Sequence, residues 1–196
     1  MKQARAEIMD IGGESTRPGS KIISQKTELK RVKKVIKNFK NNFPKTFLSI
    51  DSRKSLVMDF SLKNKADIIN DISCFKFDPK SLKILKNKNL WKIIHHMQGT
   101  PQTMQNNPKY NNVLLDIYDF FEEEIEKFKK FKHNDKIILD PGIGFGKNLK
   151  HNLMILNKIS LFHSLGFPIL IGTSRKKFIN QISGKYDTKE RIGGTI

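Results

Sequence analysis

Six short apolar runs are spaced along this chain, and each is followed at once by glycine, acidic or basic residues. The runs have the composition of β-strands and lie at 7–11, 47–50, 67–72, 91–96, 136–140 and 168–172. Segments with apolar residues at helical spacing separate most of them, at 27–39, 81–86, 114–131 and 151–166. Strands that alternate with helices and are almost wholly apolar predict a parallel sheet covered by helices.

The helical segments also predict their own boundaries and buried faces. In 27–39, the spacing of Val32, Val35 and Ile36 indicates one apolar face. Gly166 follows the last apolar residue of 151–166 and is expected to end that helix.

Two architectures contain such a sheet, the open doubly wound sheet and the eight-stranded TIM barrel. In an open sheet, ligand-binding residues concentrate where the strand order reverses, whereas in a barrel every loop after a strand faces one site. Polar residues follow all six runs here, which favours an α/β fold of the TIM (β/α)8 type. Only six of eight strands are found, so we expect an incomplete barrel holding roughly strands two to seven, as a single domain over 1–196.

Composition narrows the class of protein. The chain has 37 Lys and Arg against 19 Asp and Glu, a net charge of +18, which raises the question of nucleic-acid binding. The lysines are spread over helical segments such as 28–42, and no RGG run, zinc-finger spacing or RNA-binding aromatic pattern is present. A solvated basic surface is therefore favoured over a nucleic-acid partner.

The same sequence carries no membrane or secretion signal. No apolar run approaches the roughly 20 residues of a membrane helix, and no signal-peptide pattern is found, so we expect no membrane partner and a cytoplasmic protein. Cys74 is the single cysteine, which excludes a disulfide framework, and we expect it to be a small buried hydrophobe.

The glycine-rich stretch "DPGIGFGKN", 140–148, does not match the phosphate-binding patterns that it suggests. A P-loop needs Gly where Pro141 stands and Ser or Thr where Asn148 stands, and Lys147 occupies the third glycine of a dinucleotide motif. Two interpretations stay open. The stretch is either a turn capped by Asp140 or a loop that closes over a ligand beneath Phe145.

Single polar residues at strand ends carry further predictions. Asp51 suits a helix N-cap or a ligand equally well, and Asn70, on an apolar strand, needs a hydrogen-bond partner. His95 and His96 are adjacent, so they point to opposite faces of a strand and no protein metal site is predicted there.

The stretch "GTSRK" places basic residues at the end of the last apolar run. Ser174, Arg175 and Lys176 follow that run directly. Cations are unfavourable at a helix N-terminus, so a role in binding an anionic substrate is favoured over a basic helix start.

In order and spacing, these stretches resemble the dihydropteroate synthase family. The resemblance rests on "DIGGESTRPG", "SIDSRK", "IINDIS", "HMQGTPQTMQNNPKY", "ILDPGIGFGKNLKHNL" and "GTSRK", and it spans 1–196. It implies a TIM-barrel transferase of folate biosynthesis that joins 6-hydroxymethyl-7,8-dihydropterin pyrophosphate to p-aminobenzoate and releases pyrophosphate. It also implies these two small-molecule substrates, Mg²⁺ as the metal cofactor and a homodimer.

The resemblance also implies roles for individual residues. Asp51 and Asp140 would accept the N–H donors of the pterin, Asn70 would bond a ring nitrogen and the exocyclic amine, and Lys176 would bond the pterin carbonyl. Thr16 and Arg17, with Lys176, would be the catalytic residues, the first two lying on a mobile loop that orders around pyrophosphate and aminobenzoate. The remaining substrate-binding residues implied are Phe145, Gly172, Ser174 and Arg175. Glu14 is expected to be a buried structural acid.

Four departures from the family pattern are visible. The family's first strand, with the loop whose Asn binds Mg²⁺, is not in this sequence, nor is the final strand with its pyrophosphate-binding Arg and His. His95 stands where a Met is usual, and Lys177 where a Ser is common. We therefore expect the isolated chain to be inactive or nearly so. The alternatives are a catalytically impaired pterin-binding fragment and a pterin-dependent methyltransferase domain.

Overall fold

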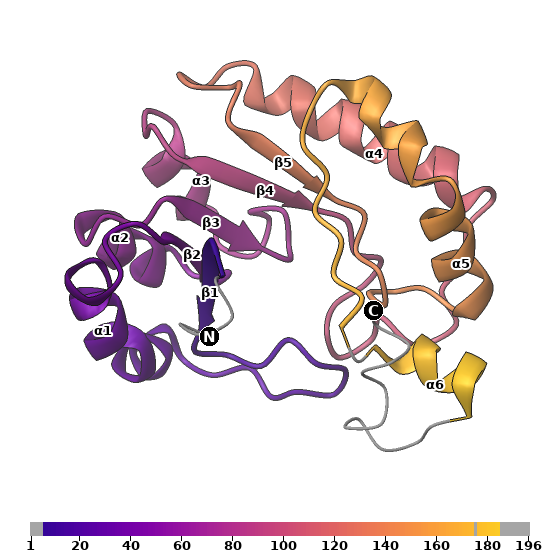
Figure 1. Cartoon of the computed structure of the whole chain (residues 1–196), viewed down its shortest axis with the longest axis horizontal. Coiled ribbons are helices and arrows are strands. Elements are labelled where there is room, and N and C mark those ends of the chain that lie inside the picture. The colour runs from indigo at the N-terminus through magenta and orange to yellow at the C-terminus, as the bar shows by residue number, and fades with distance from the viewer. Residues whose placement is uncertain (1–5, 175, 185–196) are drawn as a thin grey trace.

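The computed structural model describes residues 6–174 and 176–184, so the prediction for Arg175 lies outside the described residues. Figure 1 shows a curved sheet with helices along its outer side. The strands are β1 (Ile8–Gly12), β2 (Phe47–Asp51), β3 (Ile68–Asp71), β4 (Trp91–His95) and β5 (Ile137–Asp140). The helices are α1 (Gln25–Asn42), α2 (Ser55–Lys63), α3 (Lys80–Leu85), α4 (Val113–Phe128), α5 (Leu149–Asn157), the 3₁₀ helix η2 (Ile159–Leu165) and α6 (Lys177–Ser183).

The order of the strands distinguishes the two architectures. All pairs in the sheet are parallel, and the spatial order β1-β2-β3-β4-β5 is the order of the chain. Successive right-handed crossovers between neighbouring strands place all the connecting helices on one face, whereas a doubly wound sheet reverses its order and covers both faces. The described strands therefore form an incomplete barrel of the TIM type, as the sequence predicts.

The sixth apolar run forms less structure than expected. Only a single bridge, Leu139 to Ile169, is made, flanked by the bonds from the Leu139 N–H to the Pro168 carbonyl (2.8 Å) and from the Leu170 N–H to the Leu139 carbonyl (2.8 Å). The prediction of a full strand over 168–172 is wrong. Pro168 has no N–H to donate to a ladder, so the pairing begins late and extends over few residues.

The helices follow their sequence signals with two differences. In α1, the Ser24 hydroxyl caps the Thr27 N–H, but Val35 is 52% exposed because the buried face is centred on Ile36. The predicted helix at 151–166 breaks at Lys158 into α5 and η2. Gly166 ends η2 with φ +80°, as expected of a left-handed C-cap.

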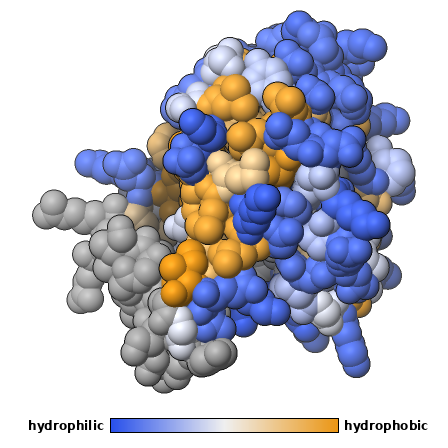
Figure 2. Space-filling view, turned by 90° about the vertical axis from the view of Figure 1, so that its right-hand side faces the viewer, coloured by the Kyte–Doolittle hydropathy of each residue, from blue (hydrophilic) through white to orange (hydrophobic). Residues whose placement is uncertain are grey.

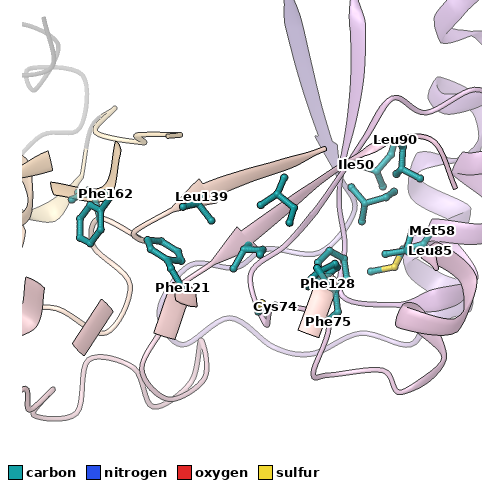
Figure 3. Close-up of a cluster of buried hydrophobic side chains, with 14 of the residues drawn as sticks. Ile50, Met58, Cys74, Phe75, Leu85, Leu90, Phe121, Phe128, Leu139 and Phe162 are labelled. Carbon is teal, nitrogen blue, oxygen red and sulfur yellow. The ribbon is translucent and has the colours of Figure 1, made fainter. Parts of the chain in front are cut away.

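The hydrophobic core lies between the outer face of the sheet and the helices (Figure 3). Ile50 and Leu139 project from the sheet towards the helical layer, where Phe121 and Phe162 pack edge to face at 5.6 Å. Cys74 is 3% exposed within this cluster, as predicted. Each such side chain contributes about 1.5–3 kcal/mol by burial, so this layer fixes the positions of the strand ends.

One side of the molecule exposes apolar residues. Figure 2 shows an apolar area on the side where α4 and α5 lie, and the exposed apolar residues of these helices include Leu115 and Leu153. Within 6–174 and 176–184, no helix is both long enough and apolar enough to cross a membrane.

Candidate active site

Four polar residues project from the inner face of the sheet, away from the helices. Side chains alternate along a strand, and register partners in a parallel sheet share a face. Asp51 and Asn70 are register partners on β2 and β3, and His95 and Asp140 are register partners on β4 and β5. His95 lies two residues after Ile93, the partner of Asn70, so all four side chains belong to the same face.

The first pair belongs to an acidic group completed by Asp10. The Asn70 amide donates to Asp10 Oδ2 at 3.0 Å, which is the partner that an Asn on an apolar strand requires. Burial, followed by the charges of Asp10, Asp71 and Glu28, raises the pKa of Asp51 to about 8. Asp51 Oδ1 and Asn70 Oδ1 are buried and, among the described residues, have no hydrogen-bond partner.

The sequence analysis did not single out Asp10. The signal that could have found it is alternation, because Asp10 and Gly12 share a face and Gly12 is the register partner of Asp51. The N-cap alternative for Asp51 is wrong, because α2 begins after Lys54 with no side-chain cap.

In the second pair, Asp140 has its partners within the described structure, whereas only one ring nitrogen of His95 does. Asp140 accepts from the Gly142 N–H at 2.7 Å and lies 3.1 Å from His95 Nδ1, and the His95 ring meets Phe145 edge to face at 4.7 Å. Burial raises the pKa of Asp140, but His95, the Gly142 N–H and Lys176 outweigh it and hold that pKa below its usual value. The turn capped by Asp140, one of the two sequence interpretations, is therefore present.

Side-chain donors bond each of the backbone carbonyls at the tip of the loop after β5. Side chains donate to four consecutive carbonyls: Lys176 to Ile143 (2.9 Å), Gln105 to Gly144 (2.8 Å), Lys147 to Phe145 (2.9 Å) and Tyr110 to Gly146 (2.8 Å). Gly142 has φ +68°, and a Cβ there would lie 1.9 Å from the His96 carbonyl oxygen. This loop is therefore rigid where it carries the Phe145 ring.

Lys147 is buried on the outer side of β4. Its Nζ lies 2.9 Å from His96 Nδ1, and burial lowers the pKa of Lys147 to about 7. Burial, followed by the charge of Lys147, lowers the pKa of His96 to about 2. The prediction that His95 and His96 face opposite sides of the strand is confirmed.

The predicted catalytic residue Lys176 and the predicted substrate-binding residue Phe145 lie together. Lys176 Nζ is 4.4 Å from the centre of the Phe145 ring, close enough for a cation–π contact. Burial lowers the pKa of Lys176, against the opposing charge of Asp140. Gly172 and Ser174 lie on the segment leading to Lys176, half-buried and exposed respectively.

The loop after β1 is fixed at its base by buried ion pairs. Glu14 accepts from Arg53 (2.6 Å), Lys54 (2.7 Å) and the Ile23 N–H (2.8 Å), and Lys54 also bonds Glu28 (2.7 Å). Burial raises the pKa of Glu14, but the bonds from Lys54 and Arg53 outweigh it, so that pKa lies below its usual value. The expectation of a buried structural acid at Glu14 is confirmed.

The tip of that loop rests on the segment after β4. The Gly19 N–H donates to the Pro101 carbonyl (3.1 Å), and Gln102 donates to the Ser20 carbonyl (2.8 Å). Thr16 is half-buried and Arg17 exposed. Within the described residues, neither side chain makes a hydrogen bond or ion pair with the inner-face residues, so no direct polar contact joins Thr16 or Arg17 to the rest of the predicted site.

A cavity of about 250 Å³ lies beside the inner face, between the loops after β3 and β4. Its walls include Arg53, Phe77, His95, Met97, Pro101 and Phe120. Only His95 is shared with the four inner-face residues, so this cavity adjoins them without enclosing them.

The described residues do not form a metal site by themselves. Within 6–174 and 176–184, no group of three or more His, Cys, Asp or Glu side chains is placed to hold a metal ion. These described residues therefore do not fit a Mg²⁺ ion held by protein side chains alone.

Comparison with known proteins decides the family. The sequence model of the pterin binding enzyme family matches residues 1–196. The chain belongs to the pterin-binding enzymes.

Relatives within this pterin-binding family agree in sequence and in structure. The dihydropteroate synthase of Synechocystis sp. is 38% identical over 196 residues, which cover 100% of this chain and 68% of that protein. Among solved structures, the Yersinia pestis dihydropteroate synthase in complex with a sulfonamide drug matches with a TM-score of 0.92 and 38% identity, over 98% of this chain and 69% of that chain. The Xanthomonas albilineans dihydropteroate synthase with 4-aminobenzoic acid matches with a TM-score of 0.91 and 30% identity, over 99% and 68% of the two chains.

Proposed function

We propose that this chain provides the substrate site of a dihydropteroate synthase. The reaction joins 6-hydroxymethyl-7,8-dihydropterin pyrophosphate to p-aminobenzoate. The bond between the pterin methylene carbon and pyrophosphate oxygen breaks, and the electron pair leaves with pyrophosphate. The amine nitrogen then bonds the methylene carbon and releases a proton to solvent, giving 7,8-dihydropteroate. The synthase names of the relatives favour this reaction over methyl transfer.

The observation that carries the proposal is the set of unpaired acceptors on the inner face. Asp51 Oδ1 and Asn70 Oδ1 are buried on register-paired strand ends and have no hydrogen-bond partner within 6–174 and 176–184. A buried acceptor that stays unsatisfied costs about 1–3 kcal/mol, so the site calls for a ligand with N–H donors. A pterin offers such donors along one edge. The pKa of Asp51 is raised to about 8 in the ligand-free chain, and its carboxyl group would accept two of these donors at once in its ionised form.

The second substrate would bind where Lys176 meets Phe145. An aromatic amine carrying a carboxylate suits a cation held over an aromatic ring, because one end of the ligand is apolar and the other anionic. The Xanthomonas relative was solved with 4-aminobenzoic acid, which supports this class of ligand. Thr16 and Arg17 would close over pyrophosphate from the loop after β1. Mg²⁺ and a homodimer stay predictions.

Binding and turnover test the proposal separately. Calorimetric titration of the purified chain with 6-hydroxymethylpterin should show saturable binding, and Asn70→Leu should weaken it about tenfold or more. The exposed variant Asn41→Leu on α1 is the matched control and should bind like the wild-type chain. An absence of pterin binding would refute the proposal.

Product formation decides between an enzyme and a binding-only chain. Pteroate is measured by chromatography after incubation with the pterin pyrophosphate, p-aminobenzoate and Mg²⁺. Slow formation that is lost in Lys176→Ala supports the synthase. Pterin binding with no pteroate formed supports the impaired pterin-binding alternative.

A further inference from the structure

His95 is the one inner-face residue whose side chain both contacts an acid of the candidate site and lines the adjoining cavity, among the described residues. It is 3% exposed, and its two ring nitrogens differ sharply in their surroundings. Nδ1 lies 3.1 Å from Asp140 Oδ2, whereas Nε2 is buried and has no hydrogen-bond partner among the described residues. A buried ring nitrogen without a partner is unfavourable, so it points to a partner that arrives with a ligand.

The contact with Asp140 sets the character of the free nitrogen. A carboxylate beside Nδ1 holds the proton of a neutral imidazole on that nitrogen, which leaves Nε2 as an acceptor. Asp140 is itself occupied, because the Gly142 N–H binds Oδ1 and His95 lies at Oδ2. Each oxygen of Asp140 therefore already has one partner, whereas His95 Nε2 has none among the described residues.

The position of His95 fits a contact with the same ligand that Asp51 and Asn70 await. The three residues share the inner face and come from the adjacent strands β2, β3 and β4. Each contributes one buried atom that no other described residue bonds: Asp51 Oδ1, Asn70 Oδ1 and His95 Nε2. All three can accept an N–H, so they form one set suited to a donor-rich heterocycle.

We propose that His95 is a ligand-contacting, specificity-determining residue, whose Nε2 bonds the bound pterin while Asp140 holds Nδ1. This inference rests on the proposed function. In this arrangement Asp140 fixes the tautomer and the orientation of the imidazole ring. The edge contact with Phe145 at 4.7 Å and the close backbone at Gly142 restrict the ring from the other sides.

Two amide substitutions separate the roles of the two ring nitrogens. The side-chain amide of glutamine reaches the position of Nε2, and that of asparagine reaches the position of Nδ1. We expect His95→Gln to bind 6-hydroxymethylpterin within about threefold of the wild-type affinity, by calorimetry. His95→Asn and the apolar His95→Leu should each bind about tenfold more weakly. Both amide variants lose the ring contact with Phe145, so the comparison between them isolates the ligand contact.

Each other outcome overturns the inference in a recognisable way. Retained affinity in His95→Asn with loss in His95→Gln would mean that His95 acts only by holding Asp140. Equal losses in the two amide variants, or wild-type affinity in His95→Leu, would exclude a bond through Nε2. Thermal unfolding of each variant shows whether it is folded at the titration temperature. If Asn70→Leu loses pterin affinity while no His95 variant does, the proposed function stands and this inference fails. If the wild-type chain binds no pterin, both fail.

Discussion

Asp51 and Asp140 end two strands of one sheet on the same face, yet their neighbours shift their pKa values in opposite directions. Burial and three further acids, Asp10, Asp71 and Glu28, raise the pKa of Asp51 to about 8. Asp140 is more deeply buried, but His95, the Gly142 N–H and Lys176 hold its pKa below the usual value. Burial alone therefore does not set the charge of a strand-end acid, because nearby charges and hydrogen-bond donors also shift its pKa.

The same contrast extends to the loops beside the two acids. The loop after β1 is fixed at its base by the buried Glu14 ion pairs, while its tip is held by two bonds to the segment after β4. The loop after β5 has four successive carbonyls bonded by side chains. The first half of the site, around Asp51 and Asn70, leaves two buried oxygens unpaired among the described residues. In the second half, around Asp140 and the loop after β5, Asp140 and the loop carbonyls are bonded, and His95 Nε2 is the unpaired atom.

The largest expected effect comes from breaking the second half at Gly142. In Gly142→Ala, the new Cβ would lie 1.9 Å from the His96 carbonyl oxygen at φ +68°, so the loop or β4 must move. We expect a loss of more than about 4 kcal/mol in the free energy of unfolding, measured by urea denaturation. Gly19→Ala in the loop after β1 is the matched control. Gly19 has φ +76°, and no atom of the described chain lies within 4 Å of the position that a Cβ would take, apart from its chain neighbours. The substitution should therefore lower the free energy of unfolding by only about 1–2 kcal/mol. Equal losses of unfolding free energy at the two glycines would contradict the view that the backbone is tightly packed at Gly142, in the loop after β5, and open at Gly19, in the loop after β1.

A smaller loss is expected from breaking the base of the first half at Glu14. Glu14→Ala leaves the buried Arg53 guanidinium and Lys54 ammonium short of a carboxylate, because only Glu28 remains beside Lys54. We expect the free energy of unfolding to fall by about 3–5 kcal/mol in urea denaturation. Glu122→Ala, on the exposed surface of α4, should change it by no more than about 0.5 kcal/mol. A Glu14→Ala chain as stable as this control would show that the ion pairs do not fix the loop.

The smallest expected effect is on how stability depends on pH, and it tests the difference between Asp51 and Asp140 directly. Asp51 keeps its proton in the folded chain up to about pH 8, whereas the unfolded chain releases it near pH 4, so the folded state loses stability as pH rises between these values. Asp51→Asn cannot ionise and should gain stability relative to wild type over that window, on the order of 1–3 kcal/mol by pH 8.

Asp140→Asn should show the opposite pH dependence. The depressed pKa of Asp140 means that its contribution is present above the unfolded value of 3.8 and is lost as pH falls through the folded pKa. The variant should therefore be less stable than wild type at pH 7, with a difference that shrinks towards pH 3. Urea denaturation at several pH values measures both variants, and parallel curves for the two would contradict opposite electrostatic surroundings.

Local patterns predicted much of the fold. Alternating apolar runs and helical segments indicated the barrel architecture, and Gly166 marked the end of a helix, because periodicity and backbone preference act within a few residues. The run at 168–172 was the exception, since a strand needs a neighbour along its whole length and only Ile169 makes a bridge to β5. That pairing depends on other segments of the chain, so the residues of 168–172 alone do not predict it.

The sequence by itself determined which residue types stand at the strand ends and, by strict alternation, that His95 and His96 must face opposite ways. Only the tertiary structure decided the partners of these residues: Asn70 bonds Asp10, 60 residues away, and His95 lies against Asp140. The physical reason is the difference in range. Backbone geometry fixes a side chain's face locally, whereas hydrogen bonds and charges act only between groups that folding has already brought within a few ångströms.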